Sequence, residues 1–151
     1  MTEPPLAVET VLVPVDGSDE SVEAAEYAAA VAETYGASVH AMYVLGEEFV
    51  RGIETGTVAE EEVLSETEAF METVGDLAEE YGVELSTSNA YGFSTTRKTQ
   101  HPGSAILDTA DDLDADFLVI PREPVSGEPG EVLEKAAEYV LLYASQPVLS
   151  V

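Results

Sequence analysis

The sequence predicts an α/β protein built on a parallel, doubly wound sheet of five strands with helices on both faces. Short apolar runs rich in β-branched residues alternate along the chain with segments whose apolar residues recur at helical spacing. One run, DFLVI at 116–120, is apolar at almost every position, which is typical of a parallel strand buried on both faces. Because strand–helix–strand crossovers are right-handed, this alternation places helices over both faces of one sheet.

The first part of the chain supplies two strands and one helix. Residues 11–15, VLVPV, predict the first strand, and Gly17 allows a tight turn after it. Ser18 is a natural N-cap for a helix whose apolar residues recur over 22–35 and which a glycine ends. Residues 37–45, ASVHAMYVL, predict the second strand.

The rest of the chain continues the alternation. After a loop, one apolar stripe over 63–81 predicts a long amphipathic helix that also ends at a glycine. Residues 83–92 predict the third strand, and a short helix over 104–115 follows it. In that short helix, Ile106, Ala110 and Leu113 are expected to lie on one face. After the strand DFLVI, a helix over 130–144 and a fifth strand over 147–151 complete the pattern.

Composition places the chain among globular proteins with one core. It has 151 residues, of which 45% are hydrophobic, so we expect a single domain over residues 1–151. It has no cysteine, which excludes disulfides, thiolate catalysis and cysteine-ligated metals. The first ten residues lack a signal-peptide pattern, and no apolar run approaches the roughly 20 residues of a membrane span. We therefore expect a cytoplasmic protein.

The charge balance is strongly acidic. There are 31 Asp and Glu residues against 5 Lys and Arg, for a formal net charge of −26. Such a field repels nucleic acid and anionic membranes, so neither is an expected partner. The acids are spread along the chain, whereas a surface for one basic partner would gather them. Molar salt shortens the Debye length to about 3 Å and screens this self-repulsion, so the composition indicates a halophilic, salt-rich cytoplasm.

Three segments together resemble one family. VLVPVDGSDESVEAAEYAAAVAETYGASVHAMYVL is similar to the start of a universal stress protein, HPGSAILDTADDLDADFLVI to its middle, and AAEYVLLYASQPVLSV to its end. The resemblance implies a flavodoxin-like (Rossmann-like, adenine nucleotide alpha hydrolase-like) fold, a role in stress response and a homodimer. In this family the last strand, here Pro147 to Val151, often pairs across the dimer, which would cover an exposed apolar edge. A short strand blunted by Pro147 is the alternative.

The stretch PREPVSGEPGEVLEKAAEYVL begins where the fourth strand ends, a usual place for a ligand in such sheets. ATP-binding members of the family carry Gly, two residues, Gly, nine residues, then Gly and Ser or Thr, so that main-chain N–H groups reach phosphates. In this chain the matching positions hold Pro121, Pro124, Glu134 and Lys135. Proline has no N–H to donate, and Glu134 would bring a carboxylate to the phosphates, so we expect no ATP site of this kind.

Other positions keep the family pattern. Asp16 matches the acid after the first strand that lies beside the nucleoside in ATP-binding members. Val15 and Val44 match positions that line the adenine pocket. Asp16 could accept a hydrogen bond from a ribose or a base, or it could cap the turn with Gly17 and Ser18, and one residue can do both.

Basic residues gather in one loop. Arg97, Lys98 and His101 lie within five positions, just before a helix that is expected to start near Pro102. Basic side chains beside a helix N-terminus favour an anion site. The alternative is that they pair with carboxylates of this protomer or its partner. Arg122, in the loop after the fourth strand, is a further candidate for a phosphate contact.

These patterns leave three hypotheses. The first is a universal stress protein that acts by binding as a homodimer, without ATP, cofactor, metal or catalytic residue, and with a protein partner that the sequence does not identify. The second is a nucleotide switch in which Asp16 holds the nucleoside of AMP or ATP, and Arg97, Lys98 or Arg122 holds the phosphates with Mg²⁺. The third is a small phosphoester hydrolase, for which no nucleophile has a recognisable setting. His40, within the second strand, is expected to be a packed histidine rather than a ligand.

Overall fold

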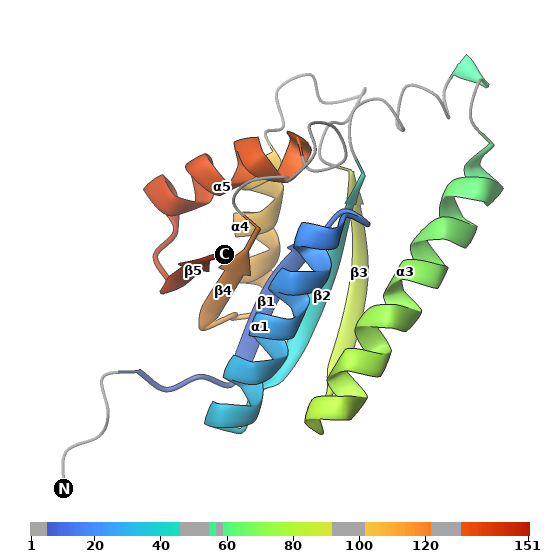
Figure 1. Ribbon diagram of the computed structural model, residues 1–151. Helices are drawn as coiled ribbons and strands as arrows, with labels where there is room; N and C mark the ends of the chain where they lie inside the picture. The colour runs from blue at the N-terminus through green and yellow to red at the C-terminus, as the bar shows by residue number, and fades with distance from the viewer. Residues whose placement is uncertain (1–5, 46–54, 57–58, 92–101, 122–130) are drawn as a thin grey trace, which may run out of the picture.

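The computed structural model describes residues 6–45, 55–56, 59–91, 102–121 and 131–151. Within them, five parallel strands form one sheet: β1 (Thr10–Val15), β2 (Ser38–Leu45), β3 (Leu85–Tyr91), β4 (Phe117–Ile120) and β5 (Val148–Ser150). Four helices alternate with the strands: α1 (Asp19–Tyr35), α3 (Glu60–Tyr81), α4 (Pro102–Asp112) and α5 (Glu131–Tyr143). The strand order across the sheet is β3-β2-β1-β4-β5 (Figure 1). The predicted α/β fold class is confirmed.

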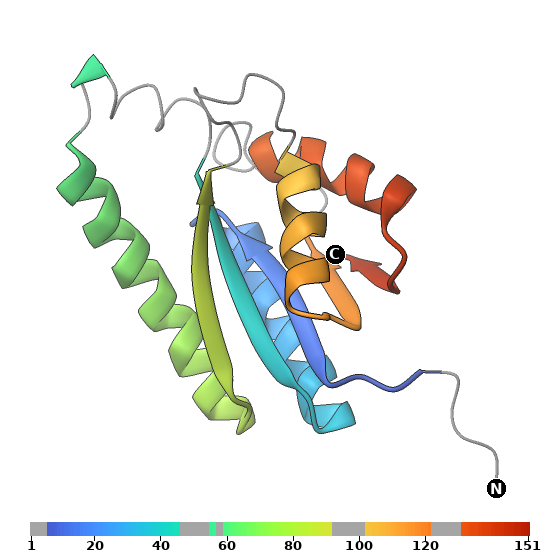
Figure 2. The same ribbon diagram turned by 180° about the vertical axis from the view of Figure 1, so that it is seen from behind.

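The sheet has a layer of two helices on each face. Helices α1 and α3 lie on one face, and Figure 2 shows α4 and α5 on the other. Each layer has its own core. The first joins the small residues of α1, such as Ala28, to strand residues such as Val13. The second joins Leu12 and Met42 to Ile106 of α4 and Val140 of α5.

The order of the strands fixes where a ligand could sit. From β1 the chain crosses to β2 on one side, whereas β4 pairs with the other side of β1. The sequence direction therefore reverses between β1 and β4, and this switch point is where doubly wound sheets place their ligands. Asp16 directly follows β1, and Pro121, which is buried, directly follows β4.

Capping residues set the helix ends as the sequence predicts. The Ser18 side chain accepts a hydrogen bond from the main-chain N–H of Ser21 and caps α1. Gly36 and Gly82 end α1 and α3 in the left-handed conformation, with φ of 69° and 70°.

The prediction for Leu113 is wrong, because α4 ends one residue earlier and the side chain is 38% exposed.

Local geometry explains why α4 ends before Leu113. Asp114 takes a positive φ of 51°, and the N–H of Ala115 donates to the carbonyl of Ala110 at 2.9 Å. This is the hydrogen bond of a helix C-terminal motif, in which a left-handed residue reverses the chain and satisfies a terminal carbonyl. The apolar residues over 104–115 therefore keep helical spacing as far as Leu113, although the helix itself ends at Asp112.

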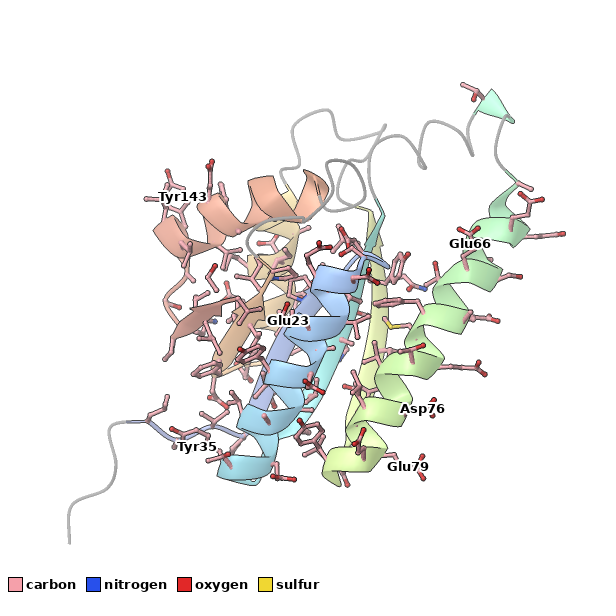
Figure 3. The ribbon with its side chains drawn as sticks, viewed as in Figure 1. Glu23, Tyr35, Glu66, Asp76, Glu79 and Tyr143 are labelled. Carbon is pink, nitrogen blue, oxygen red and sulfur yellow. The ribbon has the colours of Figure 1, made fainter. Side chains whose placement is uncertain are left out.

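The outer surface of one layer is uniformly acidic. Helix α1 carries five carboxylates and α3 carries nine, and neither helix contains a Lys or an Arg. Figure 3 shows Asp76 and Glu79 on the side of α3 that faces away from the sheet. Along α3, Glu68, Glu72 and Asp76 follow one another at intervals of four residues, which places like charges side by side. None of the described helices is long and apolar enough to cross a membrane.

This charge distribution predicts that the protein gains stability as KCl is added. Each like-charge pair four residues apart costs about 0.2–0.5 kcal/mol at low salt, so Glu72→Gln removes two such repulsions and is expected to stabilise by roughly 0.4–1 kcal/mol. In molar KCl the gain should vanish because the charges are screened. Chemical denaturation of both proteins across a KCl series measures this difference.

Glu84→Gln is the matched control, because Glu84 is exposed and lies outside any helix. It removes the same charge without a neighbour at helical spacing, so its effect should be smaller at low salt. An unfolding midpoint that does not change with KCl would contradict the prediction.

Candidate functional site

The turn after β1 is held by the side chain of Asp16. Its Oδ1 accepts a hydrogen bond from the main-chain N–H of Ser18 at 3.0 Å and a second from the Ser18 hydroxyl. Gly17, between them, takes a φ of 88°, which favours glycine. Because Ser18 is also the N-cap of α1, one carboxylate oxygen fixes both the turn and the start of the helix.

The other carboxylate oxygen of Asp16, Oδ2, lacks a hydrogen-bond partner within the described part of the chain. Oδ2 is buried and makes no hydrogen bond with any described residue. Burial raises the pKa of Asp16, against the hydrogen bonds from Ser18 and the nearby Ser21 hydroxyl, which lower it, and Glu20 raises it further. The Ser21 hydroxyl donates its proton to the main-chain oxygen of Ser18 at 2.8 Å, so it does not satisfy Oδ2. A buried acceptor without a donor is costly to the fold, so it calls for a partner such as a water molecule or a ligand. Its place beside the switch point favours a ligand.

A second side chain, Tyr43 of β2, contacts this turn from the neighbouring strand. Its hydroxyl donates to the main-chain oxygen of Asp16 at 3.2 Å. A Cβ at position 17 would lie 2.8 Å from that hydroxyl oxygen, so Tyr43 leaves no room for a side chain there. From α3, Phe70 packs edge-on against the Tyr43 ring, with centroids 5.8 Å apart, and Thr67 hydrogen-bonds its phenol.

The sequence patterns do not assign these residues to the site. Tyr43 is among the tyrosines expected in the core or at an interface, and Thr67 and Phe70 belong to the apolar stripe of the long helix. One signal was available. Thr67 is a polar residue at an inward position of that stripe, and a buried hydroxyl needs a hydrogen-bond partner.

The predicted adenine-pocket residues lie at the same end of the sheet but on different faces. Val15 packs in the core beneath α1 and α3, and Val44 in the core beneath α4 and α5. Both side chains are almost completely buried. Val15 pairs with Tyr43 in the sheet, so Val44 is the next residue along β2. The two valine side chains therefore do not form one shared surface.

Several predicted residues lie outside the described part of the chain. These are Arg97, Lys98, His101, Arg122 and Pro124. The backbone of Glu134 and Lys135 belongs to α5, but their side chains are not described. Among the described residues, no group of three or more His, Asp or Glu side chains is arranged to hold a metal ion.

His40 is a packed histidine, as its place in a strand predicts. It is buried, and its ring nitrogens Nδ1 and Nε2 lie 2.7 Å and 2.8 Å from the hydroxyls of Ser86 and Ser88 on β3. Burial lowers the pKa of His40, which favours the neutral ring. A neutral ring donates through one nitrogen and accepts through the other, so both serine contacts are satisfied.

The unpartnered oxygen predicts that Asp16→Asn stabilises the protein at neutral pH. The pKa of Asp16 is raised in the folded state, so its favourable contribution is complete below the ordinary value of 3.8 and is lost as the pH rises through the folded pKa. The asparagine Oδ1 can keep both hydrogen bonds from Ser18, and the buried charge is gone. We expect a gain on the order of 1 kcal/mol at neutral pH and none in acid.

Chemical denaturation in molar KCl at several pH values measures that gain. Asp108→Asn, at an exposed position of α4, removes the same charge and should show no such pH profile. A destabilised Asp16→Asn protein at neutral pH would mean that the carboxylate is satisfied.

Known proteins share this fold and this sequence pattern. Residues 7–151 match the Universal stress protein family. The chain is 30% identical over 144 residues to Universal stress protein MJ0531 of Methanocaldococcus jannaschii, which covers 93% of this chain and 80% of that protein. The universal stress protein from Archaeoglobus fulgidus in complex with dAMP superposes with a TM-score of 0.65 at 24% identity, covering 96% of this chain and 98% of that one.

Another solved structure, a universal stress protein in complex with cAMP, has a TM-score of 0.66 at 23% identity and covers 96% of this chain and 97% of that one. These two structures share the five-stranded fold. The family match extends over nearly the whole chain and is supported by a relative at 30% identity. The chain therefore belongs to the universal stress protein family.

Proposed function

We propose that this universal stress protein acts by binding rather than by catalysis, and that its ligand is an adenine nucleotide with one phosphate rather than ATP. It works in the stress response as a cytoplasmic homodimer. The observation that carries the ligand assignment is the buried, unpartnered Oδ2 of Asp16 beside the switch point. A cytoplasm rich in salt suits the acidic surface of α1 and α3.

Among the described residues, only one of the two carboxylate oxygens of Asp16 has a structural role. The turn uses one acceptor, Oδ1, and an asparagine would supply the same acceptor without a buried charge. The second oxygen has a use only if a donor reaches it. A ribose hydroxyl or a purine amino group is such a donor, and a hydrogen bond to a charged acceptor contributes about 1.5–3 kcal/mol.

The positions that follow β1 and β4, on either side of the switch point, favour a ligand with few phosphates. The structural relatives bound to cAMP and dAMP each hold a nucleotide with one phosphate. At the end of β4 this chain has a buried proline, Pro121, which cannot donate a main-chain N–H to a phosphate. At the end of β1, Glu20 lies near Asp16 and repels further negative charge. A nucleotide with one phosphate suits this site better than one with three.

The described residues do not favour hydrolysis. A serine nucleophile needs a histidine base and a site for the developing oxyanion. His40 does contact Ser86 and Ser88, but this cluster lies within β2 and β3, in register with Leu12 of β1, rather than at the ends of the strands. We therefore propose binding without turnover.

The last helix and strand support a homodimer. Strand β5 is an edge of the sheet and its residues are only partly buried. Beside it, Leu141, Leu142 and Tyr143 at the end of α5 are exposed, and Leu142 is 76% exposed. Residues 141–151 contain no charged side chain. Two copies with a net charge of −26 can approach most closely where carboxylates are absent, so we place the dimer contact here.

Nucleotide binding is tested by thermal unfolding in molar KCl with Mg²⁺. At about one hundred times its Kd, AMP or cAMP should stabilise the protein by ~2.7 kcal/mol and raise Tm by roughly 5–10 °C. ATP at the same concentration should give a much smaller shift. Asp16→Ala should abolish the shift with AMP, whereas Asp108→Ala on α4 should keep it.

A larger shift with ATP than with AMP would show that the loop after β4 binds phosphates after all. The absence of a shift with all nucleotides would leave a universal stress protein without a nucleotide ligand. Either result would reject the ligand assignment.

The dimer is tested by placing a charge in the uncharged surface. Leu142→Glu should convert the dimer to a monomer of 16.0 kDa, because a buried, unpaired carboxylate is expensive at an interface. Leu64→Glu is the matched control, since Leu64 is also exposed but lies on α3. Sedimentation velocity in molar KCl distinguishes the two. A wild-type monomer, or an unchanged dimer in Leu142→Glu, would contradict this placement.

A further inference from the structure

Tyr43 occupies a position between the candidate ligand site and helix α3. Its hydroxyl donates to the main-chain oxygen of Asp16, and the Thr67 side chain hydrogen-bonds the same phenol. Because the phenol proton goes to Asp16, Thr67 acts as the donor to the phenol oxygen. A chain of two hydrogen bonds therefore leads from α3, through β2, to the residue that carries the free carboxylate oxygen.

The contacts around this chain leave little freedom. The Tyr43 hydroxyl leaves no room for a Cβ at Gly17, and Phe70 packs edge-on against the Tyr43 ring. Thr67 is one of the few buried polar residues of the described chain, and Tyr43 is buried too. In a densely packed site such as this, a shift of the turn must be matched by a shift of the phenol or of α3.

We propose that Tyr43 is a positioning residue that couples ligand binding at Asp16 to helix α3. Its hydroxyl fixes the Asp16–Gly17 peptide, which directs Oδ2 into the site. When a ligand holds Asp16, the Tyr43–Thr67 contact is stabilised and α3 docks more firmly on the sheet. By linkage, the factor by which the ligand favours the docked helix is also the factor by which docking of α3 raises the affinity for the ligand. The ligand in this inference rests on the proposed function, whereas the contacts of Tyr43 with Asp16 and Thr67 do not.

Helix α3 connects the ligand site to the surface of the protein. It carries nine carboxylates without a Lys or Arg, so any partner of this helix meets a uniformly acidic surface. The inner side of its first half reaches the site through Thr67 and Phe70, while its outer side stays exposed. Among the described residues, Glu20 of α1 acts electrostatically on Asp16, and Glu66 of α3 acts on Tyr43.

The first test needs no ligand. Tyr43→Phe removes the hydroxyl and keeps the ring, so the packing on Phe70 remains. If Tyr43 positions the turn, water reaches Asp16 in this variant, and the pKa of its carboxyl falls toward the ordinary aspartate value. NMR titration of ¹³C-labelled aspartate carboxyls in molar KCl measures that pKa. Tyr35→Phe, at an exposed site of α1, is the control and should leave the pKa of Asp16 unchanged (Figure 3).

The second test adds AMP and observes α3. In the wild type, AMP should slow amide hydrogen exchange over residues 60–70, and in Tyr43→Phe this protection should disappear. The AMP Kd should rise roughly two- to tenfold, which is the effect of one lost hydrogen bond. Thr67→Val should weaken binding in the same way, and Thr67→Ser, which keeps the hydroxyl, should restore it.

The outcomes separate the two proposals. If wild-type protein does not bind AMP, the proposed ligand is wrong, and the pKa of Asp16 in Tyr43→Phe still decides whether Tyr43 positions the turn. If AMP binds but Tyr43→Phe changes neither the pKa of Asp16 nor the protection of α3, the coupling is refuted. Loss of stability without either change shows a structural role only and also refutes it.

Discussion

Two hydrogen bonds from Ser18 to one oxygen of Asp16 determine how the strand β1 passes into the helix α1. They fix the Gly17 turn, and they orient Ser18 so that its hydroxyl caps the helix. The position of α1 on the sheet follows from this cap. The same bonds turn the second oxygen of Asp16 inward, where no described residue reaches it. The fold and the candidate site therefore share one side chain.

Much of the fold could be predicted from the sequence because its signals are local. A strand such as 11–15 and a helix stop such as Gly82 are read from a few neighbouring residues. Leu113 shows where local signals fail, since the helical spacing of the apolar residues does not reveal that Asp114 reverses the chain. Asp16 could be proposed because a family pattern marks it, but its buried Oδ2 depends on the packing around it.

The tyrosine of the site required the tertiary structure. Tyr43 reaches Asp16 only because β1 and β2 pair in a register that places it beside Val15. Thr67 reaches Tyr43 only because α3, which begins 15 residues after β2 ends, packs on that side of the sheet. Neither the register nor the packing is encoded by residues adjacent in sequence. Side chains that meet across elements are therefore predicted less well than the elements.

The choice between one phosphate and three depends on contacts near the site rather than on net charge. In molar salt the Debye length is about 3 Å, so most of the net charge of −26 is screened from a bound ligand. Partly buried carboxylates at contact distance are screened much less. Glu20, in the first turn of α1, is close enough to raise the pKa of Asp16, and Asp19 precedes Glu20 in the same turn. The anion-attracting end of that helix is therefore already matched by carboxylates. In the proposed site a nucleoside donates to Asp16 and each further phosphate meets like charge, and for this reason we propose AMP rather than ATP even where salt removes the long-range field.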